Sequence, residues 1–155
     1  MRRLLLVLAL CLFLAPSAQA RGWRLVHRST ETTSASEAAP VDTSPVYPVE
    51  HALLKRINEI RLEFGLRALI FDFELHRSAR RHCGWMARSS SMVHSSGPFA
   101  ENIAMGQVDV DEVVSAWMSS PGHRANILNP NYAVTGVSAY YNTETGTPFW
   151  CQQFN

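Results

Sequence analysis

The chain has 155 residues, of which 46% are hydrophobic, and a formal net charge of +1. A chain of this length can build a single globular core. The near balance of 14 basic and 13 acidic residues argues against a nucleic acid partner and gives no overall attraction to an anionic membrane.

The first 20 residues have the features of a cleavable signal peptide. Arg2 and Arg3 form a positive start, residues 4–14 are an unbroken apolar run, and residues 18–20 (Ala-Gln-Ala) match the small-x-small cleavage pattern. The apolar run is shorter than the roughly 20 residues of a membrane-spanning helix, and no second run follows. We therefore expect cleavage after Ala20, no transmembrane segment in the mature chain, and export to the periplasm or the extracellular space. A retained membrane anchor is the alternative.

Residues 21–48 are predicted to form a disordered linker. Between Ser29 and Pro48 the sequence is rich in Ser, Thr, Ala and Pro and contains few large aliphatic residues. Such a segment cannot bury enough apolar surface to offset the entropy that it loses on ordering. The folded domain is then expected to span residues 49–155.

Apolar periodicity predicts three helices. The first covers about residues 49–64 and ends before a glycine, a residue type that commonly terminates helices. The second covers about residues 72–89, with Asp72 as its N-cap. The third starts at Asp109, and the Pro-Gly pair at residues 121–122 is expected to stop it.

Two strands are predicted at the end of the chain. Residues 135–141 and 148–154 are rich in aromatic and β-branched residues, and residues 142–146 between them are turn formers, so the segment is typical of a β-hairpin. Helices followed by a terminal hairpin indicate an α+β domain in which helices lie on a small antiparallel sheet.

Several short motifs occur together in the predicted domain. They are Asn58 and Arg61 of the first helix, residues 91–95 (SMVHS), 100–104 (AENIA), 120–128 (SPGHRANIL) and 149–154 (FWCQQF). In this order and spacing they resemble the CAP superfamily, also called the SCP-like or cysteine-rich secretory protein family, over about residues 50–155. The resemblance implies a secreted single-domain protein of bacterial type. It also implies an α-β-α sandwich of three layers with a central antiparallel sheet.

His94, Glu101 and His123 are the candidate site residues. Two imidazoles and a carboxylate can hold a divalent cation such as zinc and leave coordination positions for water. Their spacing of seven and then 22 residues is not by itself a metal signature. The resemblance implies that all three line the central cavity in which the family places histidines and acidic residues.

One acidic residue of the family pattern is missing. Many members carry a second cavity acid shortly after the tryptophan of the third helix, but Trp117 is followed here by residues 118–120 (Met-Ser-Ser). Glu112 lies before the tryptophan and is interpreted as a capping residue. We therefore expect a three-residue cluster that binds zinc or another divalent cation weakly. His82, beside the apolar stripe of the second helix, is interpreted as a hydrogen-bonded core residue.

Cys83 and Cys151 are the two cysteines that follow the signal peptide. Two cysteines in an oxidising compartment favour one disulfide. Cys83 faces the core from the second helix, and the resemblance places Cys151 in the central sheet. Two separately buried thiols are the alternative.

The predicted function is that of a secreted, monomeric and non-catalytic binding module. The resemblance implies a nearby groove for a lipid, a sterol-like molecule or another small ligand. One alternative is a metal-dependent hydrolase in which Glu101 activates a metal-bound water, although no His-Glu-x-x-His helix is present. A second alternative is a structural or adhesion role at the cell envelope, with residues 21–48 as a spacer.

Overall fold

The structure is a computed structural model that describes residues 45–155. The predicted signal peptide and most of the predicted linker lie outside the described residues. Within residues 45–155, no helix has the length and the apolar character that crossing a membrane requires.

The elements in chain order are α1 (Pro48–Glu63), β1 (Ile70–Phe71), α2 (Phe73–Ser89), β2 (Ala100–Met105), α3 (Val110–Ser119), α4 (Pro121–Ile127), β3 (Val134–Asn142) and β4 (Thr147–Phe154). The three predicted helices and the terminal hairpin are present. The Pro-Gly pair at residues 121–122 does end α3, but it also starts the short helix α4, because proline is favoured in the first turn of a helix.

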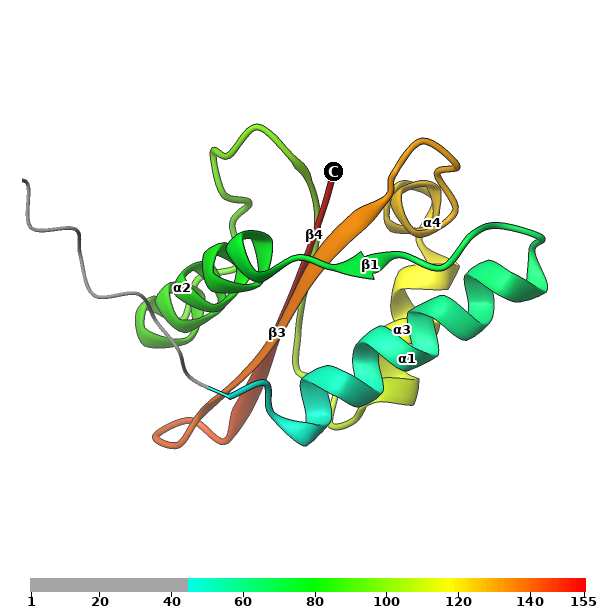
Figure 1. The fold of residues 1–155 in the computed structure, drawn as a ribbon. Coiled ribbons are helices and arrows are strands. Elements are labelled where there is room, and N and C mark those ends of the chain that lie inside the picture. The colour runs from blue at the N-terminus through cyan, green and yellow to red at the C-terminus, as the bar shows by residue number, and fades with distance from the viewer. Residues whose placement is uncertain (1–44) are drawn as a thin grey trace, which may run out of the picture. The chain divides into compact units, whose positions relative to one another are not determined.

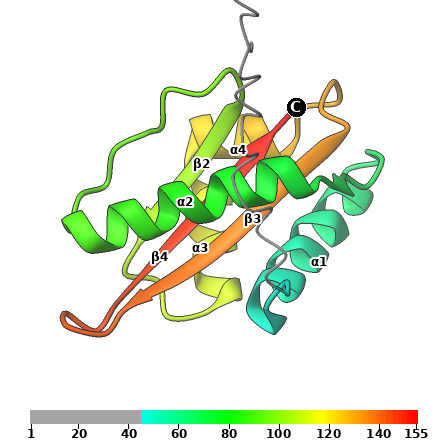
Figure 2. The ribbon, with the colours of Figure 1, turned by 60° about the vertical axis from the view of Figure 1, so that its left-hand side comes forward.

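The four strands form one sheet in the order β1-β3-β4-β2. β4 is antiparallel to both β2 and β3, as expected, whereas the two-residue strand β1 runs parallel to β3. Helix α2 covers one face of the sheet, and α1, α3 and α4 lie on the other face (Figures 1 and 2). The domain is therefore the predicted α-β-α sandwich of the α+β class.

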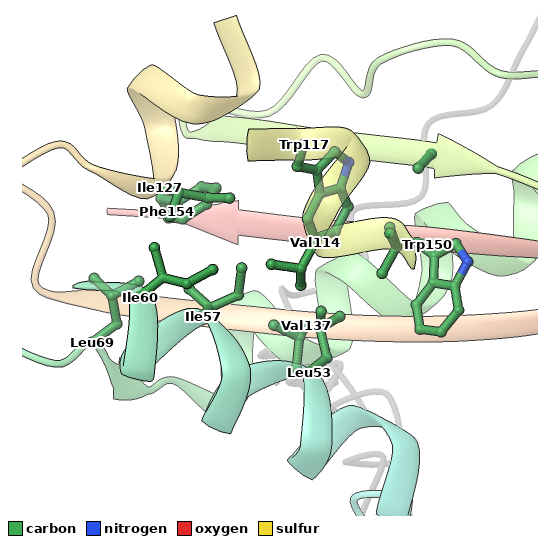
Figure 3. Packing of buried hydrophobic residues seen from close by; sticks show 12 residues of the cluster. Leu53, Ile57, Ile60, Leu69, Val114, Trp117, Ile127, Val137, Trp150 and Phe154 are labelled. Carbon is green, nitrogen blue, oxygen red and sulfur yellow. The ribbon is translucent and has the colours of Figure 1, made fainter. Parts of the chain in front are cut away.

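Each face of the sheet has its own hydrophobic core. Side chains of β4 alternate between the two faces, so that Phe149 and Cys151 pack under α2 while Trp150 and Phe154 pack under α1 and α3. Figure 3 shows the larger core, in which Trp117 and Val114 of α3 lie opposite the aliphatic side chains of α1.

Hydrogen bonds at the helix starts match the predicted caps. Asp72 Oδ1 accepts the N–H of Leu75 at 2.8 Å, and Asp109 Oδ1 accepts the N–H of Glu112 at 2.9 Å. The Glu112 carboxylate in turn accepts the N–H of Val108, which confirms its capping role. These caps satisfy backbone donors that have no partner within the helix.

The ordered domain begins slightly before residue 49. The guanidinium of Arg80 donates to the carbonyl of Pro45 at 2.7 Å and lies 4.6 Å from the ring centre of Tyr47. Pro48, which sequence analysis assigns to the linker, is the first residue of α1. Contacts with α2 therefore hold the last residues of the predicted linker.

A buried arginine fixes the position of α4. Arg61 of α1 is 1% exposed, and its guanidinium donates to four carbonyls between residues 67 and 132. One of them belongs to Ile127, the last residue of α4. Because α4 carries His123, this arginine also helps to place a candidate site residue.

Candidate functional site

Glu101 stands in β2 with its side chain directed toward the α2 face of the sheet. It pairs across the ladder with Gln153 of β4 and shares its face with Ile103, since strand residues alternate in direction. Glu101 is only 8% exposed. A buried carboxylate needs hydrogen-bond donors to compensate for its lost hydration.

Four nitrogen or hydroxyl donors surround the carboxylate of Glu101, and the Cys151 thiol lies 3.6 Å from Oε2 as a fifth, weaker donor. Oε1 accepts the backbone N–H of Ser95 at 3.0 Å and lies 2.9 Å from Nδ1 of His94. Oε2 accepts the hydroxyl of Ser95 at 2.7 Å and Nε2 of Gln153 at 2.9 Å. Burial raises the pKa of Glu101, but these hydrogen bonds outweigh burial and hold the pKa below its usual range. The ionised carboxylate thus anchors the loop of residues 90–99 to the sheet.

The bond to Glu101 fixes the orientation of His94. An imidazole that donates to a carboxylate through Nδ1 presents Nε2 on the opposite side of the ring. The His94 side chain is 58% exposed, so Nε2 is open to solvent or to a ligand. Glu101 therefore orients the His94 ring from the side opposite Nε2 and is not placed next to Nε2 as a second ligand.

His82 also belongs to this network. Its Nε2 donates to the carbonyl of Val93 at 2.8 Å and lies 3.8 Å from Oε1 of Glu101, and its ring stacks on Trp85. The predicted hydrogen bond is present, but the ring lies between α2 and the 90–99 loop rather than in the core. His76 is the core histidine of α2, with Nδ1 2.7 Å from the carbonyl of Val137.

His123 lies on α4, which two asparagines attach to β2. Nδ2 of Asn126 donates to Oδ1 of Asn102 at 2.9 Å, and Nδ2 of Asn102 donates to the carbonyl of His123 at 3.1 Å. Burial lowers the pKa of His123, and the charge of nearby His94 lowers it further. His123 is therefore neutral at neutral pH, the form that binds ligands or metals through a ring nitrogen.

A cleft of about 210 Å³ opens beside His123. Its other lining residues are mostly apolar: Met92, Ile103, Ala104, Met105, Gln107, Ala116, Trp117 and Ser120. Ser120 is one of the three residues after Trp117, where sequence analysis finds the second family acid missing. The cleft is therefore lined by one imidazole and by no Asp, Glu, Lys or Arg side chain.

The described residues do not form a three-ligand metal centre. Across residues 45–155, no group of three or more His, Cys, Asp or Glu side chains is arranged to hold an ion. Both oxygens of Glu101 instead accept hydrogen bonds from the loop and from β4. Of the three predicted ligands, His94 and His123 therefore remain as candidates, whereas the oxygens of Glu101 are occupied by hydrogen bonds.

The predicted disulfide is not formed in the structure. Cys83 and Cys151 are both free and buried, which corresponds to the alternative of two thiols. The Cys83 thiol donates to the carbonyl of Phe149 at 3.2 Å, and Sγ of Cys151 lies 3.6 Å from Oε2 of Glu101. Burial raises the pKa of Cys83 to about 12 and that of Cys151 well above its usual value, so neither thiol is a nucleophile near neutral pH.

Sequence reasoning missed Ser95, Asn102 and Gln153 as members of the site. All three lie within the motifs that carry the family resemblance, and that position is the sequence signal by which they could have been identified. Asn126 donates to Oδ1 of Asn102 and to the carbonyl of Glu101, so it attaches α4 to β2 rather than lining the cleft.

Comparisons with known proteins agree with this architecture. The profile of the cysteine-rich secretory protein family matches residues 54–154. The uncharacterized protein YkwD of Bacillus subtilis is 36% identical over 143 residues, which cover 81% of this chain and 53% of YkwD. This chain thus spans about half the length of that relative.

Two solved structures share the fold. An outer surface protein from Borrelia burgdorferi has a TM-score of 0.62 at 20% identity, over 67% of this chain and 89% of its own. An extracellular protein containing an SCP domain from Bacillus anthracis has a TM-score of 0.58 at 25% identity, over 72% of this chain and 44% of its own. The matched residues of the family profile take in every element from α2 to β4 together with most of α1. The chain belongs to the cysteine-rich secretory protein (CAP) family.

Proposed function

We propose that this chain is a secreted, non-catalytic binding domain that takes an apolar ligand into the cleft beside His123. The observation that carries the non-catalytic part of the proposal is the state of Glu101, whose two carboxylate oxygens already accept hydrogen bonds from Ser95, His94 and Gln153 and are poorly suited to act as a general base. Secretion is supported by the signal-peptide features of residues 1–20 and by the extracellular and outer-surface proteins that share the fold.

The environment of Glu101 argues against hydrolysis. A general base must offer a free lone pair and a pKa near the working pH, whereas four donors occupy this carboxylate and lower its pKa. The hydroxyl of Ser95 donates to Glu101 rather than to a histidine, so no imidazole takes its proton. Both cysteines are buried and protonated.

The size and lining of the cleft indicate the class of ligand. Pockets that enclose a drug-sized molecule usually measure about 300–1,000 Å³, and this cleft of about 210 Å³ is smaller. Met92, Ile103, Met105 and Trp117 give it an apolar wall. It therefore suits one end of an acyl chain or a compact apolar molecule better than a whole sterol.

Weak binding of a divalent cation is a second, separable part of the proposal. His94 and His123 would hold zinc with water in the remaining positions, and Glu101 would orient His94 from behind, as carboxylates do behind metal-binding histidines. Two protein ligands without a third predict modest affinity. Protons would compete with the metal for His123 at acidic pH.

The experiment uses the secreted chain, a pyrene-labelled fatty acid and zinc. His123→Ala should weaken zinc binding measured by calorimetry, and Met105→Asp should weaken binding of the fatty acid measured by fluorescence. His51→Ala is the matched control, because His51 is exposed on α1 and does not line the cleft. Equal fatty-acid binding by the wild type and Met105→Asp would show that the cleft is not the binding site of the fatty acid. Chelator-sensitive turnover of an ester or a peptide would favour the hydrolase instead.

A further inference from the structure

Helix α2 is the only helix that the described residues place on its face of the sheet, so its outer side meets solvent (Figures 1 and 2). Its inner side is buried through Ala79, Cys83 and Met86. The outer side carries Arg81, Trp85 and Arg88 at helical spacing, and all three are exposed, Trp85 by 45%. An exposed tryptophan between two arginines is an unusual outer face for a helix, because large aromatic side chains normally bury.

Two further exposed side chains flank this face. On one side, the ring of His82 stacks on Trp85 and bonds to the carbonyl of Val93, whose side chain is 53% exposed. On the other side, Tyr140 lies against Gly84, since a Cβ at Gly84 would be 3.4 Å from its ring. Arg81, Trp85, Arg88, Val93 and Tyr140 are named the α2 patch.

The α2 patch is locally cationic although the whole chain is nearly neutral. Among the described residues, neither Arg81 nor Arg88 forms an ion pair. Glu74, the acidic residue at the start of the same helix, pairs with Arg77 at 2.8 Å. Glu144 in the β3–β4 turn lines the hollow that Arg88 and Tyr140 share, and it is the acid nearest to that end of the patch along the hairpin.

We propose that the α2 patch docks this domain on the surface of an anionic phospholipid bilayer. Two unpaired guanidiniums complement lipid phosphates, with Arg preferred for bidentate contact. Tryptophan and tyrosine favour the boundary between headgroups and acyl chains, because one end of each ring system is apolar and the other is polar. Val93 adds apolar contact at the same level. A soluble polyanion without apolar groups, such as polyphosphate, would use the arginines but would leave Trp85 and Val93 exposed.

Docking on this patch has a consequence for the cleft. Met92 lines the cleft beside His123, and Val93, the next residue, belongs to the patch. Lipid bound at the patch would therefore lie close to the cleft mouth. This consequence rests on the proposed binding function, whereas the docking itself does not.

The test is flotation of the secreted chain with lipid vesicles at low salt. Vesicles of equal parts phosphatidylcholine and phosphatidylglycerol should carry the protein upward, and vesicles of phosphatidylcholine alone should not. A cationic residue at an anionic surface changes the partition constant by about fivefold, so Arg81→Gln with Arg88→Gln should reduce it by at least tenfold. Trp85→Ala should also reduce it, and salt should weaken the wild type.

Matched controls separate the patch from charge and hydrophobicity in general. Arg67→Gln and Leu62→Ala remove an exposed arginine and an exposed leucine near the end of α1, on the far side of the sheet, and should leave flotation unchanged. Circular dichroism checks that every variant is folded.

Unchanged flotation of the Arg81→Gln, Arg88→Gln double variant would overturn the proposal, because residues 21–44 or another surface would then carry binding. Equal flotation with neutral vesicles, or binding to soluble polyphosphate without flotation, would also overturn it. The fatty-acid assay is separate, so failure of cleft binding leaves this result intact.

Discussion

Nδ1 of His94 lies 2.9 Å from Oε1 of Glu101, and this contact joins an exposed loop side chain to a buried strand side chain. Ser95 adds two more bonds from the loop to the same carboxylate. Glu101, a residue of β2, therefore anchors the middle of the 90–99 loop through His94 and Ser95. Replacing that acid should affect stability and loop order together.

Glu101→Gln should destabilise the domain by about 2–4 kcal/mol, because the amide cannot accept all the bonds of a buried carboxylate. Urea denaturation followed by circular dichroism measures the free energy of unfolding. Glu63→Gln is the control, since Glu63 is exposed and its nearest ion-pair distance is 3.9 Å. Equal losses for both variants would contradict the anchoring role.

The stability difference between wild type and Glu101→Gln should depend on pH. The folded state lowers the pKa of Glu101, so folding favours the ionised form. Its contribution is therefore complete above the unfolded pKa of about 4.3 and is lost as the pH falls through the folded pKa. Denaturation series between neutral pH and pH 3 should show the two proteins converging in acid. A stability difference that stays constant down to pH 3 would contradict the claim that folding lowers the pKa of Glu101.

Arg61→Ala should be among the most destabilising single substitutions, at about 3–5 kcal/mol, because it leaves buried carbonyls without their donor. The four carbonyls that Arg61 serves belong to the segment after α1, to the end of α4 and to the segment after α4. Arg56→Ala serves as the control: the Arg56 side chain is 38% exposed, its ion pairs are 3.5 Å or longer, and we expect a loss of about 0–1 kcal/mol. Chemical denaturation of both variants tests the contrast.

Both cysteines should resist alkylation in the folded protein. The pKa of Cys83 is raised to about 12 by burial, and both thiols are inaccessible, so iodoacetamide should modify them only after unfolding. Mass spectrometry before and after denaturation counts the modified sites. The same measurement without reductant decides the disulfide, because a loss of two hydrogens would show a Cys83–Cys151 bond in place of two thiols.

His82→Ala should loosen the 90–99 loop while leaving zinc affinity nearly unchanged. The variant loses the bond to the carbonyl of Val93, which corresponds to about 1 kcal/mol. Hydrogen exchange in residues 90–99 should become faster than in the wild type, and His51→Ala should not change it. A large loss of zinc affinity in His82→Ala would show that His82 is itself a ligand.

The sequence by itself determined the helices, the hairpin and the family. Helices α1, α2 and α3 have apolar periodicity and local capping residues, and these signals depend on neighbours within a few positions. The hairpin of β3 and β4 has its turn between its own strands. The motifs around His94, Glu101 and His123 identified the site region because each is a short contiguous segment.

Only the tertiary structure decided what depends on residues distant in the chain. β2 is a strand because residues 100–105 pair with residues 149–154, and β1 is a strand because it meets β3. Glu101 could have been a metal ligand by its chemistry, but Ser95 and Gln153 saturate its oxygens once β2 and β4 are paired. Arg81 and Arg88 are diluted in the charge of the whole chain and form a patch only because α2 has no helix outside it among the described elements. Composition sums charges over the chain, whereas binding responds to the charges that share one surface.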